Sequence, residues 1–307
     1  MTGPAQIAQP IDIDSFNAEN IKKTFYEKGY IHIPNVLSKD DVNSLRLDLL
    51  TIFNRRAEQG ESSHKTSAKK QYRDIIADFF PQYPELFEQI FLQSSVLKNI
   101  QILLDNKFVL LPETSAMRDY FNTLHTDTTE AEMRGCSLPR DPDFLMLTAA
   151  IYLQDNTAEA GGGMYFVPGS HNKPDSCIPV RLRKQVYDNS KWRQKLNKLF
   201  GYRLYDFDRL LNEHPEGEDL VTKAGDMIIF DSRAVHRSSF ARDRQWLPDG
   251  NKLALFAHFM RNNQILPEYL NYLYTKTTDK NDYQYLQGTR DISALKSLCA
   301  THGFEVY

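Results

Sequence analysis

From Phe108 onwards the chain carries a series of short segments rich in β-branched and aromatic residues, each bounded by turn residues. These segments are Phe108–Leu111, Met117–Leu124, Phe144–Leu153, Met164–Val167, Met227–Phe230 and Leu253–Met260. Their length and composition are typical of β-strands. Many short strands require an architecture that limits exposed sheet edges, and a jelly roll or a barrel does so. We therefore predict a mainly β core of one of these two kinds.

The first third of the chain is predicted to be mainly helical. Ser38 and Asp41 form a capping-box pattern before apolar residues at helical spacing, and a second helical stretch runs from about Leu86 to Leu104. Gly29 would end a shorter helix before the strand-like segment Tyr30–Pro34. We expect a single domain over residues 1–307, divided into a helical layer (1–105), the β core (106–265) with a helical insertion at about 171–218, and a C-terminal extension (266–307).

Composition and charge exclude several classes of protein. With 41% hydrophobic and 25% charged residues the chain is globular. Its net charge of −3 gives no overall attraction to nucleic acid, although a local patch could still act, and we expect no nucleic-acid partner. Cys136, Cys177 and Cys299 lack the spacing of a disulfide framework, so we expect free thiols in a reducing compartment. No stretch approaches the roughly 20 apolar residues of a membrane span, and the first residues do not resemble a signal peptide. We expect a cytoplasmic protein without a membrane span.

His125 and Asp127 are the first candidate metal ligands. Residues two apart in a strand point to the same side, so these two side chains can bind one ion. A similar pair, His214 and Glu216, is interrupted by Pro215 and followed by Gly217, which break strand pairing, and we reject it. His236 can supply the third ligand. Two imidazoles and one carboxylate leave three positions of the metal open, an arrangement that suits non-haem Fe(II) in oxygen chemistry.

The surrounding motifs make this site more specific. They are the glycine turn Gly161-Gly162-Gly163, the loop Val167-Pro168-Gly169-Ser170-His171, and the turn Gly225-Asp226 before the strand that leads to His236. Together with His125 and Asp127, they closely resemble the phytanoyl-CoA dioxygenase family of Fe(II)- and 2-oxoglutarate-dependent oxygenases, over about Gly29 to Met260. The resemblance implies a double-stranded β-helix (jelly-roll, cupin-like) core, the ligands His125, Asp127 and His236, and 2-oxoglutarate and dioxygen as co-substrates.

The resemblance also implies a site for the distal carboxylate of 2-oxoglutarate. Ser238 matches a family serine in that role, but the position of the family's arginine falls on Leu247. Lys252 opens the next predicted strand in the same alternation phase as His258, and we favour it as the cation, with Arg244 and Arg242 as alternatives. A lysine would bind the carboxylate as a point charge rather than as a bidentate fork.

The family resemblance further implies the reaction class. Oxidation of a substrate by hydroxylation, desaturation or ring formation would accompany release of succinate and carbon dioxide. Asp127 argues against halogenation, because related halogenases replace this carboxylate with a small residue. We expect a small or medium-sized organic substrate, in specialised metabolism for example. The alternatives are a protein or peptide hydroxylase of the same chemistry and a jelly-roll binding protein without catalysis.

Basic residues are concentrated in the predicted insertion. The segment from Arg181 to Arg203 contains eight basic residues against one acid, Asp188. A solvated helix face is the simpler interpretation, and a lid that meets an anionic or carrier-linked substrate is the sharper one. We expect His32, His64, His171 and His302 to be surface or structural residues. His258 lies in a predicted strand and either faces the cavity or belongs to the core, and we favour the core. The sequence carries no signal of an oligomeric state.

Overall fold

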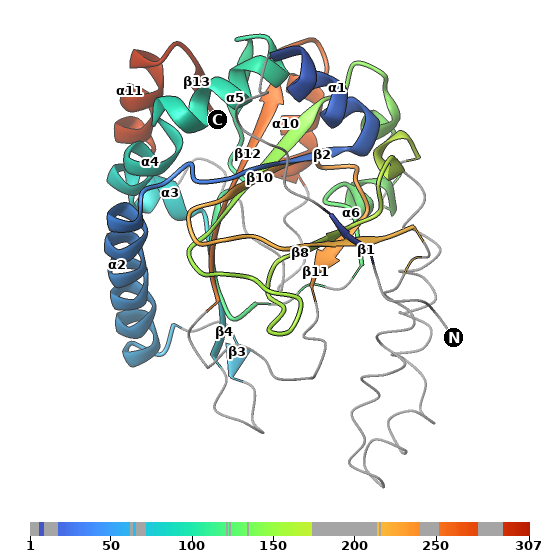
Figure 1. Cartoon of the computed structure of the whole chain (residues 1–307). Helices are drawn as coiled ribbons and strands as arrows, with labels where there is room; N and C mark the ends of the chain where they lie inside the picture. Colours follow the sequence, from blue (N-terminus) through green and yellow to red (C-terminus); the bar gives the residue numbers. More distant parts are fainter. Residues whose placement is uncertain are drawn as a thin grey trace, which may run out of the picture.

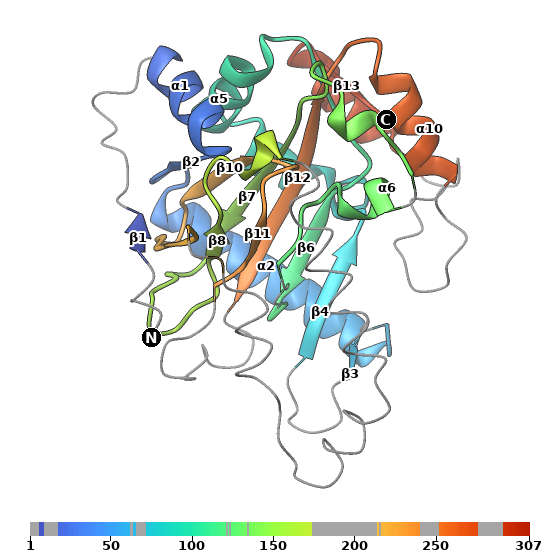
Figure 2. The same cartoon turned by 90° about the vertical axis from the view of Figure 1, so that its right-hand side faces the viewer.

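The structure is a computed structural model of the chain, shown in Figures 1 and 2. It describes residues 6–8, 18–61, 64–65, 72–120, 122, 124–133, 135–173, 214, 216–239, 252–275 and 291–307. Most of the predicted helical insertion, including the basic segment from Arg181 to Arg203, lies outside the described residues, as do Cys177, Arg242 and Arg244. The side chain of His64 lies outside them as well.

The described elements are helices in the first third and at the C-terminal end, with strands between and among them. The helices are α1 (Ala18–Lys28), α2 (Lys39–Glu58), α3 (Phe79–Gln82), α4 (Pro84–Phe91), α5 (Ser94–Leu104), α6 (Thr129–Met133), α10 (Leu266–Thr275) and α11 (Ser293–Thr301). The strands are β1 (Gln6–Ala8), β2 (Tyr30–Ile33), β3 (His64–Lys65), β4 (Tyr72–Ala77), β5 (Phe108–Leu110), β6 (Ser115–Arg118), β7 (Met146–Tyr152), β8 (Met164–Phe166), β9 (Glu218–Leu220), β10 (Met227–Asp231), β11 (His236–Ser238), β12 (Leu253–Arg261) and β13 (Glu305–Val306).

The strands form two sheets that face each other. The major sheet has the order β2-β10-β7-β12-β6-β4-β3, with β5 paired to β12 and β13 paired to β5, and the minor sheet has the order β1-β9-β8-β11. Figure 2 looks onto the minor sheet, with the major sheet behind it. Tyr152 and Phe230 of the major sheet share one buried cluster with Met164 and Phe166 of the minor sheet. Two packed sheets of this kind make the jelly roll that the short strands predict.

Helices cover the outer face of the major sheet (Figures 1 and 2). Residues of α1, α2, α3, α4, α5 and α11 form one buried cluster with alternate residues of β7, β10 and β12. On β12 these are Leu253, Leu255, Ala257 and Phe259, whereas Lys252, Phe256 and His258 face the space between the sheets. Strands buried on both faces lack the polar alternation of a half-exposed strand. No helix in the described parts of the chain is both long and apolar enough to cross a membrane.

The structure confirms several local predictions. Ser38 caps α2 by accepting a hydrogen bond from the Asp41 amide, and the Ser38 amide donates to the Asp41 carboxylate, completing the capping box. Gly29 ends α1 with a φ of +84°. Cys136 and Cys299 are free thiols, and burial raises the pKa of Cys299 to about 12. These features depend on short-range patterns.

Other local predictions were wrong. The helical stretch predicted from Leu86 to Leu104 is two helices, because Gln93 adopts an extended conformation between α4 and α5. The strand predicted from Met117 to Leu124 ends at Arg118, where Asp119 takes a φ of +52° and its amide donates to the Lys252 carbonyl. The sequence analysis missed β4, and the short strand β3 lies within a segment predicted to be a loop.

The turn at Gly225 and Asp226 fastens the start of β10 to the segment after β2. The Gly225 carbonyl accepts hydrogen bonds from two successive amides, Val36 and Leu37. The Asp226 carboxylate accepts from the Asn35 amide and pairs with His32 Nε2 at 2.8 Å. Gly225 has a φ of +90°, and a Cβ placed on it would lie 2.8 Å from the Leu37 carbonyl oxygen. Only glycine fits this turn without displacement of the neighbouring backbone.

We predict that Gly225→Ala destabilises the protein more than Gly303→Ala does. Gly303 also has a positive φ, +81°, but a Cβ there would meet nothing within 4 Å. Gly303→Ala therefore costs only the left-handed conformation, about 1–2 kcal/mol, while steric overlap at Gly225 adds about 1–3 kcal/mol. Denaturant unfolding of both variants measures the difference. Equal losses of stability would contradict the close backbone contact.

Candidate metal centre and active site

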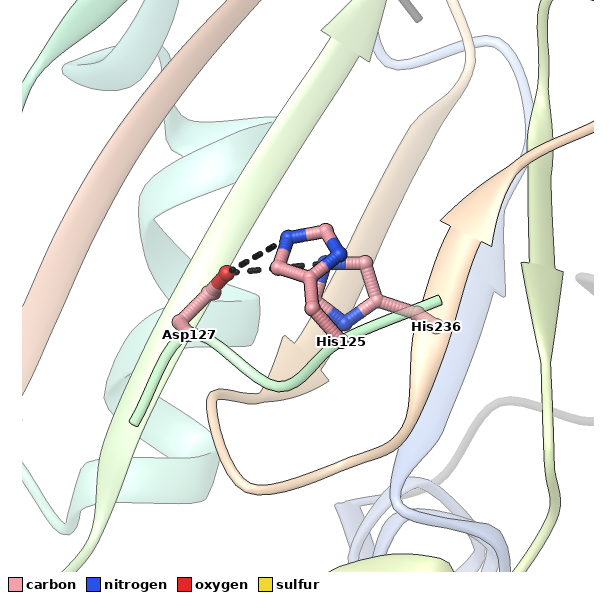
Figure 3. A group of neighbouring side chains, drawn as sticks. All are labelled: His125, Asp127 and His236. Carbon is pink, nitrogen blue, oxygen red and sulfur yellow. Dashed lines mark ion pairs between the residues drawn. The ribbon is translucent and has the colours of Figure 1, made fainter. Parts of the chain in front are cut away.

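His125, Asp127 and His236 meet at one point between the two sheets (Figure 3). Asp127 Oδ1 lies 3.7 Å from His125 Nε2 and 3.5 Å from His236 Nε2. The main chains of the two histidines exchange hydrogen bonds of 2.9 and 2.8 Å, which fixes the residue before the turn against the start of β11. The three side chains predicted from the sequence are therefore brought together by backbone pairing.

His236 is held in the orientation that a metal ligand needs. Its Nδ1–H donates to the Ala234 carbonyl at 2.9 Å, and this leaves Nε2 unprotonated and free to bind a metal. The ring packs between two aromatic rings, with centroid separations of 4.6 Å to Phe230 and 5.8 Å to Phe166. The aromatic contacts restrict rotation of the imidazole, so Nε2 points at Asp127.

Asp127 has one oxygen for the metal and one that is already engaged. Oδ2 accepts a 2.7 Å hydrogen bond from the Thr148 hydroxyl of β7, while Oδ1 faces both imidazoles. Burial acts to raise the pKa of Asp127, but the charges of His236, His258 and His125 and the Thr148 hydrogen bond hold that pKa below its ordinary value. The carboxylate is thus kept ionised, as a metal ligand must be.

A cluster of threonine hydroxyls supports the turn that carries Asp127. Thr129 Oγ1 accepts from the Thr126 amide at 3.0 Å and lies 2.6 Å from Thr126 Oγ1. Thr128 Oγ1 donates to Glu132 at 2.9 Å, and the Asp127 amide donates to the Ser232 carbonyl. The sequence analysis missed this network. The signal was present in the consecutive hydroxyl residues after His125, which favour side-chain hydrogen bonds to nearby backbone.

The donor set fits Fe(II). Within the part of the chain that the structure describes, His125, Asp127 and His236 are the one group of three or more ligand-type side chains whose ligand atoms lie within 4.8 Å of one another. Nitrogen and oxygen donors bind first-row metal ions at about 2.0–2.2 Å, so atoms at these separations can share one ion. Two imidazoles and one carboxylate on one side leave the other side open for further ligands.

A pocket of about 480 Å³, including the space at its mouth, extends from the three ligands towards Lys252. Lys252 is 3% exposed, and its Nζ donates to the Tyr120 carbonyl at 2.6 Å and to Ser238 Oγ at 3.2 Å. Ser238 Oγ also accepts from the Asn122 amide at 3.0 Å. The structure thus places Lys252 beside Ser238 in the pocket of the metal site, as strand phase suggested, whereas Arg242 and Arg244 lie outside the described residues.

The other histidines agree with the expectation in part. His171 is a buried structural residue, and its Nε2–H donates to the Tyr26 carbonyl at 3.1 Å under Gly29. The pKa of the His171 imidazole is lowered, mainly because the ring is buried. His258 lines the pocket rather than the core. His214 accepts a hydrogen bond from the Glu216 amide, and neither residue belongs to the candidate ligand group found among the described residues.

Comparison with solved structures shows the fold. The non-haem α-ketoglutarate-dependent epimerase SnoN from nogalamycin biosynthesis has 18% identity and a TM-score of 0.51, covering 80% of this chain and 82% of its own. HygX from Streptomyces hygroscopicus, with nickel and 2-oxoglutarate bound, has 17% identity and a TM-score of 0.50, covering 81% and 88%. EctD from S. alaskensis, with bound Fe, has 15% identity and a TM-score of 0.52, covering 80% and 76%. The predicted jelly-roll fold is confirmed.

Comparison of sequences identifies the family. No curated protein sequence is significantly similar to this chain. The sequence model described as Phytanoyl-CoA dioxygenase (PhyH), however, matches residues 25–242, more than two thirds of the 307 residues. The matched region begins within α1 and contains all three candidate metal ligands and Ser238. The chain therefore belongs to the phytanoyl-CoA dioxygenase family, whose members are Fe(II)- and 2-oxoglutarate-dependent oxygenases.

Proposed function

We propose that this protein is an Fe(II)- and 2-oxoglutarate-dependent dioxygenase that oxidises a small or medium-sized organic molecule. The observation that carries the proposal is a single pocket with His125, Asp127 and His236 at one end and Lys252 beside Ser238 at the other. The first group suits a metal ion, and the second suits a carboxylate. A dicarboxylic 2-oxo acid that binds the metal with one end has its other carboxylate near such a cation.

In this proposal His125 Nε2, Asp127 Oδ1 and His236 Nε2 hold the iron. When bound, iron, 2-oxoglutarate and dioxygen together supply the oxidising chemistry, in which succinate and carbon dioxide are released as the substrate is oxidised. Thr148 keeps Oδ2 of Asp127 away from the metal, so that the carboxylate contributes a single oxygen. The Ala234 carbonyl fixes the His236 tautomer through Nδ1–H. Both contacts preserve the open side of the metal site.

Lys252 and Ser238 would bind the distal carboxylate of 2-oxoglutarate. An ammonium group has three donors, and Lys252 commits one to Tyr120 and one to Ser238. Replacement of the Ser238 contact by a carboxylate oxygen would free the serine hydroxyl to donate to the same carboxylate. A buried carboxylate without partners is costly, so both contacts would strengthen binding of a dicarboxylate over a monocarboxylate.

The remaining pocket wall is mostly apolar and supports an organic substrate. It includes Met117, Tyr152, Met164, Phe230 and Phe256, which exclude water from the metal site. A structure of SnoN in complex with Fe3+, α-ketoglutarate and nogalamycin RO shows that a protein with this fold can hold a small molecule at 19% identity to this chain. An anionic or carrier-linked substrate stays a hypothesis, because the basic segment that suggests it lies outside the described residues.

The outcome of the oxidation can be hydroxylation, desaturation or ring formation. SnoN is an epimerase and SnoK, a second protein of similar fold at 20% identity, is a carbocyclase, so the fold supports more than hydroxylation. The carboxylate of Asp127 occupies the position that halogenases leave open, and halogenation is not part of the proposal.

We predict that the purified protein binds 2-oxoglutarate only with Fe(II) present. Anaerobic addition of both should give a weak visible charge-transfer absorption, and admission of oxygen should then release succinate slowly without any added substrate. Omission of Fe(II) is the control. Absence of both the absorption and succinate release from a protein shown to bind Fe(II) would contradict the proposed function and favour a binding protein without catalysis.

We predict that Asp127→Ala abolishes this activity. The ionised carboxylate is one of three metal ligands, and even residues that only orient a ligand typically contribute about 10–100-fold to metal affinity or activity. Fe(II) affinity and succinate release should therefore fall by at least about a hundredfold. The matched control is Asp143→Ala, an exposed aspartate outside the pocket. Full activity of the Asp127 variant would remove this residue from the metal site.

We predict that Lys252→Ala raises the KM for 2-oxoglutarate by about 10–100-fold while Fe(II) affinity stays unchanged, because the lost contact is a charged hydrogen bond to the co-substrate. Lys252→Arg should retain part of the affinity, since it keeps the charge. Thermal unfolding of both variants checks that the buried pocket is intact. An unchanged KM in a folded Lys252→Ala protein would shift the assignment to Arg242 or Arg244.

A further inference from the structure

His258 lies on β12, and its polar side chain is on the pocket side of that strand. β12 runs along the major sheet (Figure 2), and residues two apart on it face the same way. Lys252, Phe256 and His258 therefore line one pocket, together with the metal ligand Asp127. The His258 main chain pairs with Thr148, whose hydroxyl holds Asp127. The register thus places His258 beside the metal end of the pocket.

The imidazole of His258 has a buried nitrogen, Nδ1, that forms no hydrogen bond with any of the described residues. An unsatisfied polar atom in an enclosed site is costly and commonly marks a place where a ligand or water binds. Two other donors of the pocket are engaged, because the Thr148 hydroxyl donates to Asp127 and Lys252 donates to Tyr120 and Ser238.

The electrostatics agree that His258 is near the metal site. The charge of His258 is one of those that hold the pKa of Asp127 below its ordinary value although burial opposes this. His258 and Asp127 line the same pocket.

A 2-oxo acid that binds iron uses its keto oxygen and one oxygen of the adjacent carboxylate. The second oxygen of this carboxylate lies off the metal and, inside a pocket, requires a hydrogen-bond donor. Lys252 and Ser238 serve the distal carboxylate in the proposed function, and Thr148 serves Asp127. We propose that His258 donates a hydrogen bond from its imidazole to the iron-bound carboxylate of 2-oxoglutarate, which makes it a second anchor for the co-substrate at the metal end.

This inference rests on the proposed function and adds a residue that acts on a different part of the same ligand. The two anchors make separable contributions. Lys252 distinguishes dicarboxylic from monocarboxylic 2-oxo acids, whereas His258 contacts the 2-oxo acid group that both classes share. A monocarboxylic 2-oxo acid such as 2-oxobutyrate keeps the metal-binding end of 2-oxoglutarate and lacks its distal carboxylate, so it reports on His258 alone.

The test is an anaerobic titration of the Fe(II)-loaded protein with 2-oxoglutarate and with 2-oxobutyrate, followed by the visible charge-transfer absorption. His258→Ala should weaken binding of both ligands by the same factor, about ten- to hundredfold, as expected for one hydrogen bond to a charged group. Lys252→Ala should weaken the binding of 2-oxoglutarate and leave the binding of 2-oxobutyrate unchanged. His258→Gln, which keeps an N–H donor, should recover part of the affinity. His302→Ala, a change of an exposed histidine on the far end of the chain, is the matched control.

Three results would overturn the inference. If His258→Ala binds both 2-oxo acids with wild-type affinity, His258 does not form the proposed contact. If only the affinity for 2-oxoglutarate falls, His258 contacts the distal carboxylate instead. Loss of Fe(II) affinity, measured without a 2-oxo acid, would make His258 a support of the metal instead. If the Tm of His258→Ala shows that this variant does not fold, His258→Gln is tested instead. A folded Gln variant that binds Fe(II) like the wild type but binds both 2-oxo acids more weakly still supports the contact. Reduced Fe(II) affinity of the Gln variant overturns it. Failure of the wild-type protein to bind 2-oxoglutarate would instead count against the proposed function.

Discussion

The reciprocal main-chain hydrogen bonds between His125 and His236 are the contact on which the candidate active site depends. They join two segments that are distant in sequence and set their register, and the hydrogen bond from the Asp127 amide to Ser232 secures the same segment two residues later. All three candidate metal ligands therefore belong to one backbone unit at the edge of the minor sheet. The major sheet contributes Thr148 to the carboxylate ligand and Lys252 to the far end of the pocket. Aromatic packing between the sheets, through Phe166 and Phe230, keeps these two contributions at a constant separation.

The pocket contains opposite charges that are held apart by their own partners. Asp127 is surrounded by imidazoles and a hydroxyl, and Lys252 by a carbonyl and a hydroxyl. Buried charges are tolerated when hydrogen bonds satisfy them, and each of these two has such bonds without pairing with the other. With a divalent metal ion held by His125, Asp127 and His236, both ends of the space between them would be positive. Such a space suits a ligand that carries negative charge at both ends, which is the charge pattern of a dicarboxylic 2-oxo acid.

The sequence predicted those parts of the structure that depend on short-range patterns or on motifs. The capping box of α2, the end of α1 at Gly29 and most of the core strands follow from local chemistry. The sequence predicted by strand alternation that His125 and Asp127 lie together; they do, but Asp127 lies in a turn that follows the bridge between His125 and His236. Strand phase predicted that Lys252 lies on the pocket side, and the structure has it there beside Ser238. The failures have physical causes. Left-handed Asp119 ended a strand that composition alone extends, and β4 contains two successive charged residues, Arg73 and Asp74, which interrupt its apolar pattern.

One face of β12 is buried beneath the helices and the other is partly exposed in the pocket, so the two faces have different roles. Leu253, Leu255, Ala257 and Phe259 pack beneath the helices, while the residues between them line the pocket. Alternate residues of this one strand therefore serve folding and ligand recognition. Substitution of the pocket-facing residues leaves the core-facing residues unchanged. A family with such a strand can therefore diversify its chemistry while its fold stays the same. Low overall identity to proteins of the same fold is the expected outcome of that division.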